Sequence, residues 1–330
     1  MLGPPPLALT LLPWSGLDHD PARAAWMLFL LPCLLLALWL LGRRLALVPA
    51  LVLAAGFALG APARASFEVA QVYPLLLLLH VLALEGWRRR ASVGGLALAP
   101  LILLRGWHGL PQAFGWLWAG RPLGLLWALG GVGLGALLSL PLLGLESWRR
   151  FAEQARSAPF DSETAGALAY QTWRSLALRL STQGPNLPDP ALPGLHPWLH
   201  LGGALLILGL CAWAARRLDR PGSGLPFAAW TVLALLLAPF AEDHHFLLAA
   251  LPAFLLWEEA PARRPLVLLA LLLLLPAWHY DSPALWGGWR SLAGYPRVWG
   301  MAVLLGALVW EGWSVAGRAR LSPRAASPSS

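Results

Sequence analysis

The stretch AAWMLFLLPCLLLALWLLGRR (residues 24–44) contains 18 residues, 24–41, without a charged side chain, and it ends in two arginines. An uncharged apolar run of that length fits the hydrocarbon core of a bilayer, and a basic pair directly after it is typical of the cytoplasmic end of a span. Across all 330 residues, 58% are hydrophobic, 12% are charged and the mean hydropathy is +0.61. These values are too apolar for a soluble domain of this length. We therefore predict an all-α polytopic membrane protein.

Further apolar segments follow the first, and together they predict about eleven transmembrane or re-entrant helices. Several are shorter than the usual length of about 20 residues, which predicts tilted or re-entrant geometry. We expect one membrane domain over residues 1–317 and a disordered, Ser- and Pro-rich tail over residues 318–330. The predicted spans cover residues 24–41, 45–62, 71–86, 91–104, 109–119, 122–145, 197–215, 225–241, 245–257, 265–278 and 297–313.

Arginine clusters fall on every second connection between these segments, at residues 43–44, 88–90, 121, 216–220, 263–264 and 318–324. The positive-inside rule places these connections and the C-terminus in the cytoplasm, with the protein in the cell (inner) membrane. The remaining connections are then external: residues 1–23, 64–71, 146–196, 242–245 and 279–296. Although the net charge is +8, the arginines lie at helix ends and form no single basic face, which argues against nucleic-acid binding.

The long external loop, residues 146–196, contains a helical repeat of apolar residues. We predict an amphipathic helix along the membrane interface, with Gln171, Arg174 and Ser175 on its opposite face. A second amphipathic piece begins at Trp148 and Phe151. The apolar repeat consists of Ala165, Leu168, Ala169, Thr172, Trp173, Leu176, Ala177 and Leu180.

Ionisable residues are densest in the external corner Glu242–His245, and we predict Asp243, His244 and His245 as catalytic candidates. An ordinary solvated corner would have the same composition. Adjacent histidines do not easily bind one metal ion on a regular helix, and the chain has no glycine-rich phosphate loop, so we predict neither a metal nor a cofactor.

Two other external segments offer groups for substrate binding. In the segment 66–73, Gln71 and Tyr73 can donate to a sugar hydroxyl or a phosphate oxygen, although Ser66 with Glu68 can simply begin a helix. In the turn 105–111, Arg105 and His108 can hold an anionic head group, although Arg105 can equally extend to the interface without a ligand.

The predicted interfacial helix and the N-terminus supply the remaining candidates. Gln171, Arg174, Ser175 and Arg179 can hold a pyrophosphate or phosphate leaving group, or the arginines can face lipid phosphates only. Asp18 and Asp20 form the acidic pair nearest the N-terminus; either can act as a general base or cap the helix that starts at Pro21.

Five groups of residues, in this order and spacing, resemble glycosyltransferase family 87, the polyprenyl-phosphate-mannose-dependent mannosyltransferase-like enzymes of the GT-C class. Together they cover nearly the whole chain, and each is weak alone. They are Pro4–Leu7 through Trp14 with Ala24–Trp26, Ala70–Tyr73, Gly94–Leu96 with Arg105 and Pro111, Tyr170–Thr172 with Arg179, and Ala238–Phe240 with Asp243–His245 and Pro252.

The chain departs from this family at several of these positions. Ala70 replaces a glycine, Tyr73 an asparagine and Arg105 a lysine, while Tyr170 and Thr172 stand in an asparagine-glutamine-serine motif. The family's first membrane helix and the external loop with its acidic catalytic residue would precede the Pro4 segment. The resemblance therefore implies that the family's catalytic acid lies upstream of Met1, and we expect an N-terminally truncated member.

The resemblance implies a GT-C-like fold and the transfer of a hexose, mannose in the first instance, on the external face. The implied partners are a polyprenyl-phosphate sugar donor, a lipid or glycan acceptor, and the bilayer. A carboxylate would accept the proton of the acceptor hydroxyl while cations stabilise the departing phosphate. Two alternatives stay open: a secondary transporter or lipid flippase, because short interrupted segments such as 91–119 can mark a midplane site, or a non-catalytic truncated family member.

Overall fold

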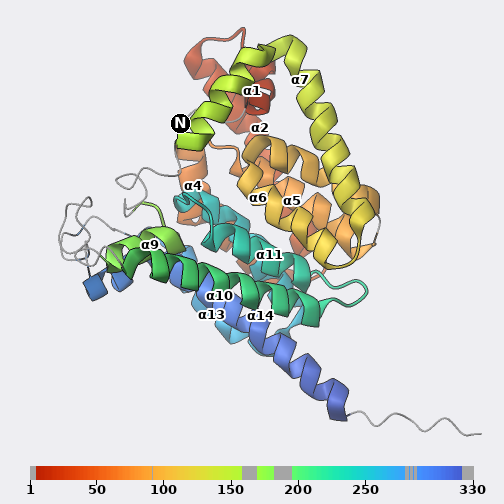
Figure 1. The fold of residues 1–330 in the computed structure, drawn as a ribbon, viewed down its shortest axis with the longest axis vertical. Helices are drawn as coiled ribbons and strands as arrows, with labels where there is room; N and C mark the ends of the chain where they lie inside the picture. The colour runs from red at the N-terminus through yellow and green to blue at the C-terminus, as the bar shows by residue number, and fades with distance from the viewer. Residues whose placement is uncertain are drawn as a thin grey trace, which may run out of the picture.

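The protein is described by a computed structural model, which covers residues 5–90, 92–157, 169–181, 195–278, 282, 285 and 288–321. The described residues form helices and no strand, which confirms the predicted all-α class. Figure 1 shows their arrangement. The elements are α1 (Pro5–Leu11), η1 (Leu12–Trp14), α2 (His19–Gly42), α3 (Leu47–Leu59), α4 (Ala61–Glu68), α5 (Tyr73–Arg88), η2 (Ser92–Ala97), α6 (Leu98–Trp118), α7 (Pro122–Ser157), α9 (Trp173–Leu180), α10 (Leu195–Leu218), α11 (Leu225–Leu236), η4 (Asp243–Ala249), α12 (Ala250–Glu259), η5 (Pro261–Arg263), α13 (Arg264–Leu274), η7 (Gly288–Gly294) and α14 (Pro296–Leu321).

Within the described residues, four helices are long and apolar enough to cross a membrane: α2, most of α7, α10 and α14. The bent pair α3 and α4, which meet at 41°, would make a fifth. The structure is therefore that of a polytopic membrane protein. The other apolar helices are shorter, as predicted, and the exact number of crossings stays a prediction.

Helix α6 contains the predicted turn between two short apolar segments. Arg105 has non-helical backbone angles (φ −155°, ψ 72°). A Cβ atom on Gly109 would lie 2.8 Å from the backbone nitrogen of Ile102. In a straight helix, residues seven apart are separated by about 10.5 Å along the axis. The two halves of α6 therefore fold back on one another at Arg105.

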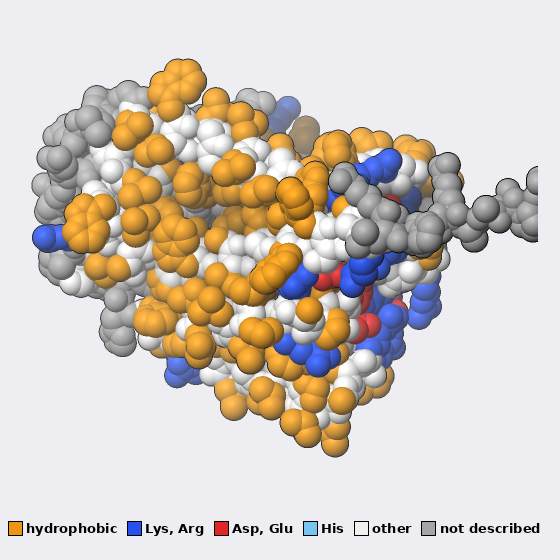
Figure 2. All heavy atoms as spheres, turned by 90° about the horizontal axis from the view of Figure 1, so that it is seen from below, with side chains coloured by type: hydrophobic (Ala, Val, Ile, Leu, Met, Phe, Trp, Pro, Cys, Tyr) orange, Lys and Arg blue, Asp and Glu red, His pale blue; other side chains and the backbone are white. Residues whose placement is uncertain are grey.

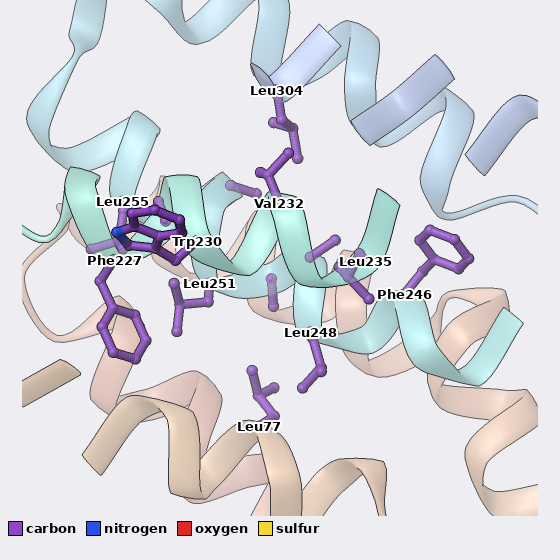
Figure 3. Packing of buried hydrophobic residues seen from close by; sticks show 14 of the residues in the cluster. Leu77, Phe227, Trp230, Val232, Leu235, Phe246, Leu248, Leu251, Leu255 and Leu304 are labelled. Atoms are coloured by element: carbon purple, nitrogen blue, oxygen red, sulfur yellow. The ribbon is translucent and has the colours of Figure 1, made fainter. Parts of the chain in front are cut away.

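Helix α11 forms the centre of the molecule, between α5 and α6 on one side and α10 and α14 on the other (Figure 1). All 12 of its residues are buried, as expected for a helix that is apolar on every side. Figure 3 shows Leu235 of α11 beside Phe246 of η4, while Val232 of α11 points toward Leu304 of α14. The corner between α11 and η4 is thus held by well-packed helices on both sides.

The arginine-bearing connections predicted to share one side of the membrane do lie together. Figure 2 shows their charged side chains gathered at the right of the view, whereas the left is mostly hydrophobic. Ion pairs join elements distant in sequence: Arg43 with Glu85 (3.0 Å), Arg88 with Glu258 (2.7 Å) and Glu259 (2.6 Å), Arg121 with Asp219 (2.9 Å), and Arg263 with Glu311 (3.4 Å). We call this region the arginine face.

The long loop differs from its prediction in one respect. The helix α9 begins at Trp173, with the Thr172 hydroxyl accepting a hydrogen bond from the Ser175 backbone N–H (3.2 Å). Gln171 therefore precedes the helix and does not belong to its polar face, because a threonine cap competes with continued helix. Ala165 and Leu168 lie outside the described residues.

Helix α7 breaks where the predicted span ends. Gly144 has φ +72°, a left-handed conformation that favours glycine. Beyond Gly144, the indole Nε1 of Trp148 donates to the hydroxyl of Ser139 (3.0 Å). The predicted second amphipathic piece therefore folds back on the part of α7 that precedes Gly144. At the other end of the chain, α14 continues to Leu321, three residues past Arg318, and residues 322–330 lie outside the described part.

Candidate functional site

The site begins at the connection between α4 and α5. Ala70 has φ +51°, which is why a glycine suits this position in the family that the chain resembles. The Gln71 backbone N–H donates to the carbonyl of Ser66 (2.7 Å), and α5 then starts at Tyr73. Ser66 and Glu68 do not cap α5, because the Ser66 hydroxyl donates to Pro62 (2.9 Å) and Glu68 ends α4. This turn directs Gln71 and Tyr73 to the same region.

Four ring side chains from three distant segments meet here, and Tyr73 is one of them. The Tyr73 hydroxyl lies 3.1 Å from Nε2 of His108, on the second half of α6. The ring centroid of Tyr73 is 4.9 Å from that of His244 and 4.4 Å from that of His245. The rings of His108 and His245 are 5.5 Å apart. We call Tyr73, His108, His244 and His245 the histidine cluster.

A cation lies beside this cluster. The Arg105 guanidinium donates to Oε1 of Gln71 (2.8 Å) and lies 5.8 Å from the centre of the Tyr73 ring. The fold-back of α6 places Arg105 there, at the tip of the turn. Gln71 thus orients a half-buried positive charge at the edge of the histidine cluster.

Glu242, the residue before η4, places a carboxylate at the same edge. Its side chain accepts from the His245 backbone N–H, while its own backbone N–H donates to Nδ1 of His245 (3.1 Å). Because Nδ1 accepts, the proton of a neutral His245 ring sits on Nε2. Oε2 of Glu242 lies 3.7 Å from Nδ1 of His244, and the side chain is 46% exposed.

The electrostatic environment of Glu242 favours a proton acceptor. Burial raises the pKa of its carboxyl, and Arg105 opposes part of that rise. A carboxylate with a raised pKa is a stronger base than an ordinary glutamate. From the sequence, Glu242 was predicted to lie in this corner, but its neighbours were chosen as the catalytic candidates.

Asp243 lies in the corner as predicted, next to His244, and it makes an ion pair with a residue that does not belong to the histidine cluster. Its Oδ1 is 3.0 Å from Nε of Arg297, whose side chain is fully buried. Arg297 also donates to the carbonyl of Pro276 (2.9 Å). Arg297 was not predicted as a site residue, although an arginine at the start of the apolar segment 297–313 was a visible signal in the sequence.

Gln171 is hydrogen-bonded to the same corner. Its backbone N–H donates to the carbonyl of Ala241 (2.7 Å), the residue before Glu242, and its side chain donates to the carbonyl of Gly294 (2.9 Å). Arg179, on the buried side of α9, hydrogen-bonds the Tyr295 hydroxyl. Gln171 therefore connects the corner to the residues just before α14, and Arg179 connects α9 to the same residues.

The remaining predicted residues lie elsewhere. Arg174 lies near two histidines of α10. Asp18 precedes α2 without a side-chain cap, and Asp20 pairs with His19 (3.0 Å) at a largely exposed position. His19 and Ala70 line a mostly apolar cavity of about 760 Å³ that reaches the residue next to Gln71.

The catalytic acid that the resemblance places upstream of Met1 is a different case. Met1 itself lies outside the described residues, which begin at Pro5. The structure therefore does not bear on an acid before Met1, and the truncation stays a prediction. The carboxylate that the described residues do bring to the histidine cluster is that of Glu242, which was not among the predicted catalytic residues.

The structure thus defines a class: an all-α, polytopic membrane protein with a carboxylate, a cation and three histidines gathered at the end of the bundle away from the arginine face. The chain belongs to glycosyltransferase family 87, whose model matches residues 2–242. The match ends at Glu242, so the paired histidines lie just beyond it. No curated protein and no solved structure matches the chain. Membership of this family indicates a membrane glycosyltransferase.

Proposed function

We propose that this protein transfers a hexose, mannose in the first instance, from a polyprenyl-phosphate donor to a lipid or glycan acceptor. The observation that carries the proposal is the placement of Glu242 and Arg105 at one edge of the histidine cluster. Glycosyl transfer needs a base for the acceptor and positive charge for the leaving group. Glu242 can be that base, and Arg105 can supply that positive charge.

In the proposed reaction, the acceptor hydroxyl oxygen attacks the anomeric carbon of the sugar. The bond between that carbon and the phosphate oxygen breaks, and the phosphate leaves with the electron pair. Glu242 accepts the hydroxyl proton. Arg105, oriented by Gln71, stabilises the negative charge on the phosphate, and His244 and Tyr73 supply hydrogen-bonding groups beside it.

The proposed orientation places this chemistry outside the cell. Helix α5 runs from Tyr73 at the site to Arg88 at the arginine face, and its 16 residues span about 24 Å. A polyprenyl-phosphate sugar enters from the membrane, and the cavity beside Ala70 offers an apolar surface for its chain. Positively charged loops stay cytoplasmic, so the site faces the external side.

The direct test uses membranes that contain the protein and radiolabelled polyprenyl-phosphate mannose. Arg105→Gln should lower the transfer rate by about 100-fold, the effect expected when one group that stabilises a developing anion is removed. Arg149→Gln is the matched control, since Arg149 is an exposed arginine of α7, and it should transfer within two-fold of the unchanged protein. Equal rates for Arg105→Gln and the control would contradict the proposed role of Arg105.

A further inference from the structure

A second group of polar side chains lies away from the histidine cluster, where α9 meets the first turns of α10. The imidazole rings of His196 and His200 are stacked, with centroids 6.0 Å apart and an interplanar angle of 5°. The guanidinium of Arg174 interacts electrostatically with both rings. The indole of Trp173 joins the two helices by donating to the His200 carbonyl (3.1 Å).

Among the described residues, these three polar side chains have no hydrogen-bond or ion-pair partner. Nε2 of His196 and Nδ1 of His200 are buried atoms with no hydrogen bond in the described structure. Arg174 likewise makes no ion pair or hydrogen bond there, and burial without a counter-charge lowers the pKa of its guanidinium. Buried donors without partners are unfavourable, so their grouping indicates a missing ligand.

The hydrogen-bond donors of Arg174, His196 and His200 suit an anionic ligand. A neutral imidazole carries one N–H, which can sit on the unpartnered nitrogen of each ring, and Arg174 adds several donors and a positive charge. The same positive charge would repel a metal cation. Several donors around one charge match the oxygens of a phosphate group.

An apolar groove continues from this group through Trp173. The groove, about 270 Å³ in volume, lies between α10 and α14. Two of its lining residues are open to the surface: Leu206 is 62% exposed and Trp299 is 37% exposed. Both flanking helices are candidate membrane spans, so the groove faces the chains of the bilayer.

We propose that Arg174, His196 and His200 bind the phosphate of a bilayer phospholipid, with one acyl chain of that lipid in the groove between α10 and α14. Positive charge without a counter-ion matches the head group, and the adjoining apolar groove matches the chain. A phospholipid is the abundant membrane molecule that carries both. This binding does not depend on the proposed sugar transfer.

The test measures binding of radiolabelled dioctanoyl phosphatidate to the full-length protein in detergent. Arg174→Gln and the pair His196→Gln with His200→Gln should each weaken binding by about ten-fold, as expected for loss of charge-assisted hydrogen bonds. Gly306→Phe should weaken it similarly, because Gly306 lines the groove and has no neighbouring atom within 4 Å to block a new side chain.

Two variants serve as matched controls and should bind within two-fold of the unchanged protein. Arg149→Gln removes an exposed arginine elsewhere, and Gly209→Phe adds a phenylalanine at an open glycine of α10 that does not line the groove. Unchanged binding in Arg174→Gln would overturn the proposal. Displacement by inorganic phosphate at equal concentration would assign a free-anion site, and tighter binding of polyprenyl phosphate would assign the carrier lipid; either result overturns the choice of phospholipid.

Discussion

At the scale of single residues, adjacent carboxylates have different environments. Asp243 is paired with the buried Arg297, whereas Glu242 is half-exposed beside the histidine cluster. A buried cation that keeps its counter-charge stabilises the corner, while a carboxylate free of such a pair can exchange a proton. We therefore propose a structural role for Asp243 and a chemical role for Glu242.

The ion pair predicts a specific pattern of stability. Asp243→Asn should lower the free energy of unfolding by about 3 kcal/mol, because it leaves the buried Arg297 without a counter-charge. The double variant Asp243→Asn with Arg297→Met should lose less than the single variant, since no buried charge then remains. Denaturant unfolding in detergent measures both. A double variant less stable than Asp243→Asn would contradict this role.

The raised pKa of Glu242 predicts a pH dependence. A general base works only when deprotonated, so the transfer rate should fall as the pH decreases through the pKa of Glu242. Burial raises that pKa, so the fall should occur above the ordinary glutamate value of about 4.3. A pH–rate profile measures it. A Glu242→Gln variant that keeps the same acid limb in its residual activity would assign the limb to another group.

Residues of the site were partly predictable from sequence. The polar segments that were predicted to be external led to Gln71, Tyr73, Arg105, His108, His244 and His245, and the structure brings these residues together. The division of roles between Glu242 and Asp243 was not predictable, because it depends on Arg297, which lies 54 residues from Asp243 in the chain. Periodicity gives no information on such a distant partner.

At the scale of elements, the fold-back of α6 has the largest effect on the site, because it places Arg105 and His108. Alternating short apolar segments around Arg105 made this turn predictable. The start of α9 was not predictable, because the apolar repeat continues upstream of Thr172. The helix nevertheless begins at Trp173, since the Thr172 hydroxyl caps it there.

The fold-back predicts different effects for two glycines of the same turn. Gly109→Ala should destabilise the protein by about 1–3 kcal/mol and reduce transfer, because its Cβ would lie 2.8 Å from the Ile102 nitrogen. Gly106→Ala, with no atom within 4 Å of the added Cβ, is the control and should change little. Thermal unfolding compares them. Equal stability of the two variants would contradict the close packing of the two halves.

At the scale of the whole molecule, the arrangement of arginines was the strongest sequence signal. Connections far apart in the chain meet at the arginine face, and ion pairs stabilise them there. Length alone does not determine the number of crossings, because several apolar helices are shorter than a bilayer is thick and lie among longer ones.

The proposed orientation in the membrane predicts which side of the bilayer a thiol reagent must reach to label each new cysteine. Cys33 and Cys211 are buried, so new cysteines can be tested one at a time with a membrane-impermeant thiol reagent. His19→Cys should react in intact cells, and Arg89→Cys, at the arginine face, should react only after the membrane is opened. Both side chains are largely exposed, at 86% and 72%. The reverse pattern would place the site in the cytoplasm.

The central claim is that the polar groups around Tyr73 carry out sugar transfer. It is tested most directly by the rate at which purified protein in liposomes moves mannose from polyprenyl-phosphate mannose to an acceptor. We predict a loss of about 100-fold or more in Glu242→Gln, the contribution expected of a general base, with Glu146→Gln, an exposed glutamate of α7, unchanged. Transfer by Glu242→Gln at the rate of the unchanged protein would contradict the account.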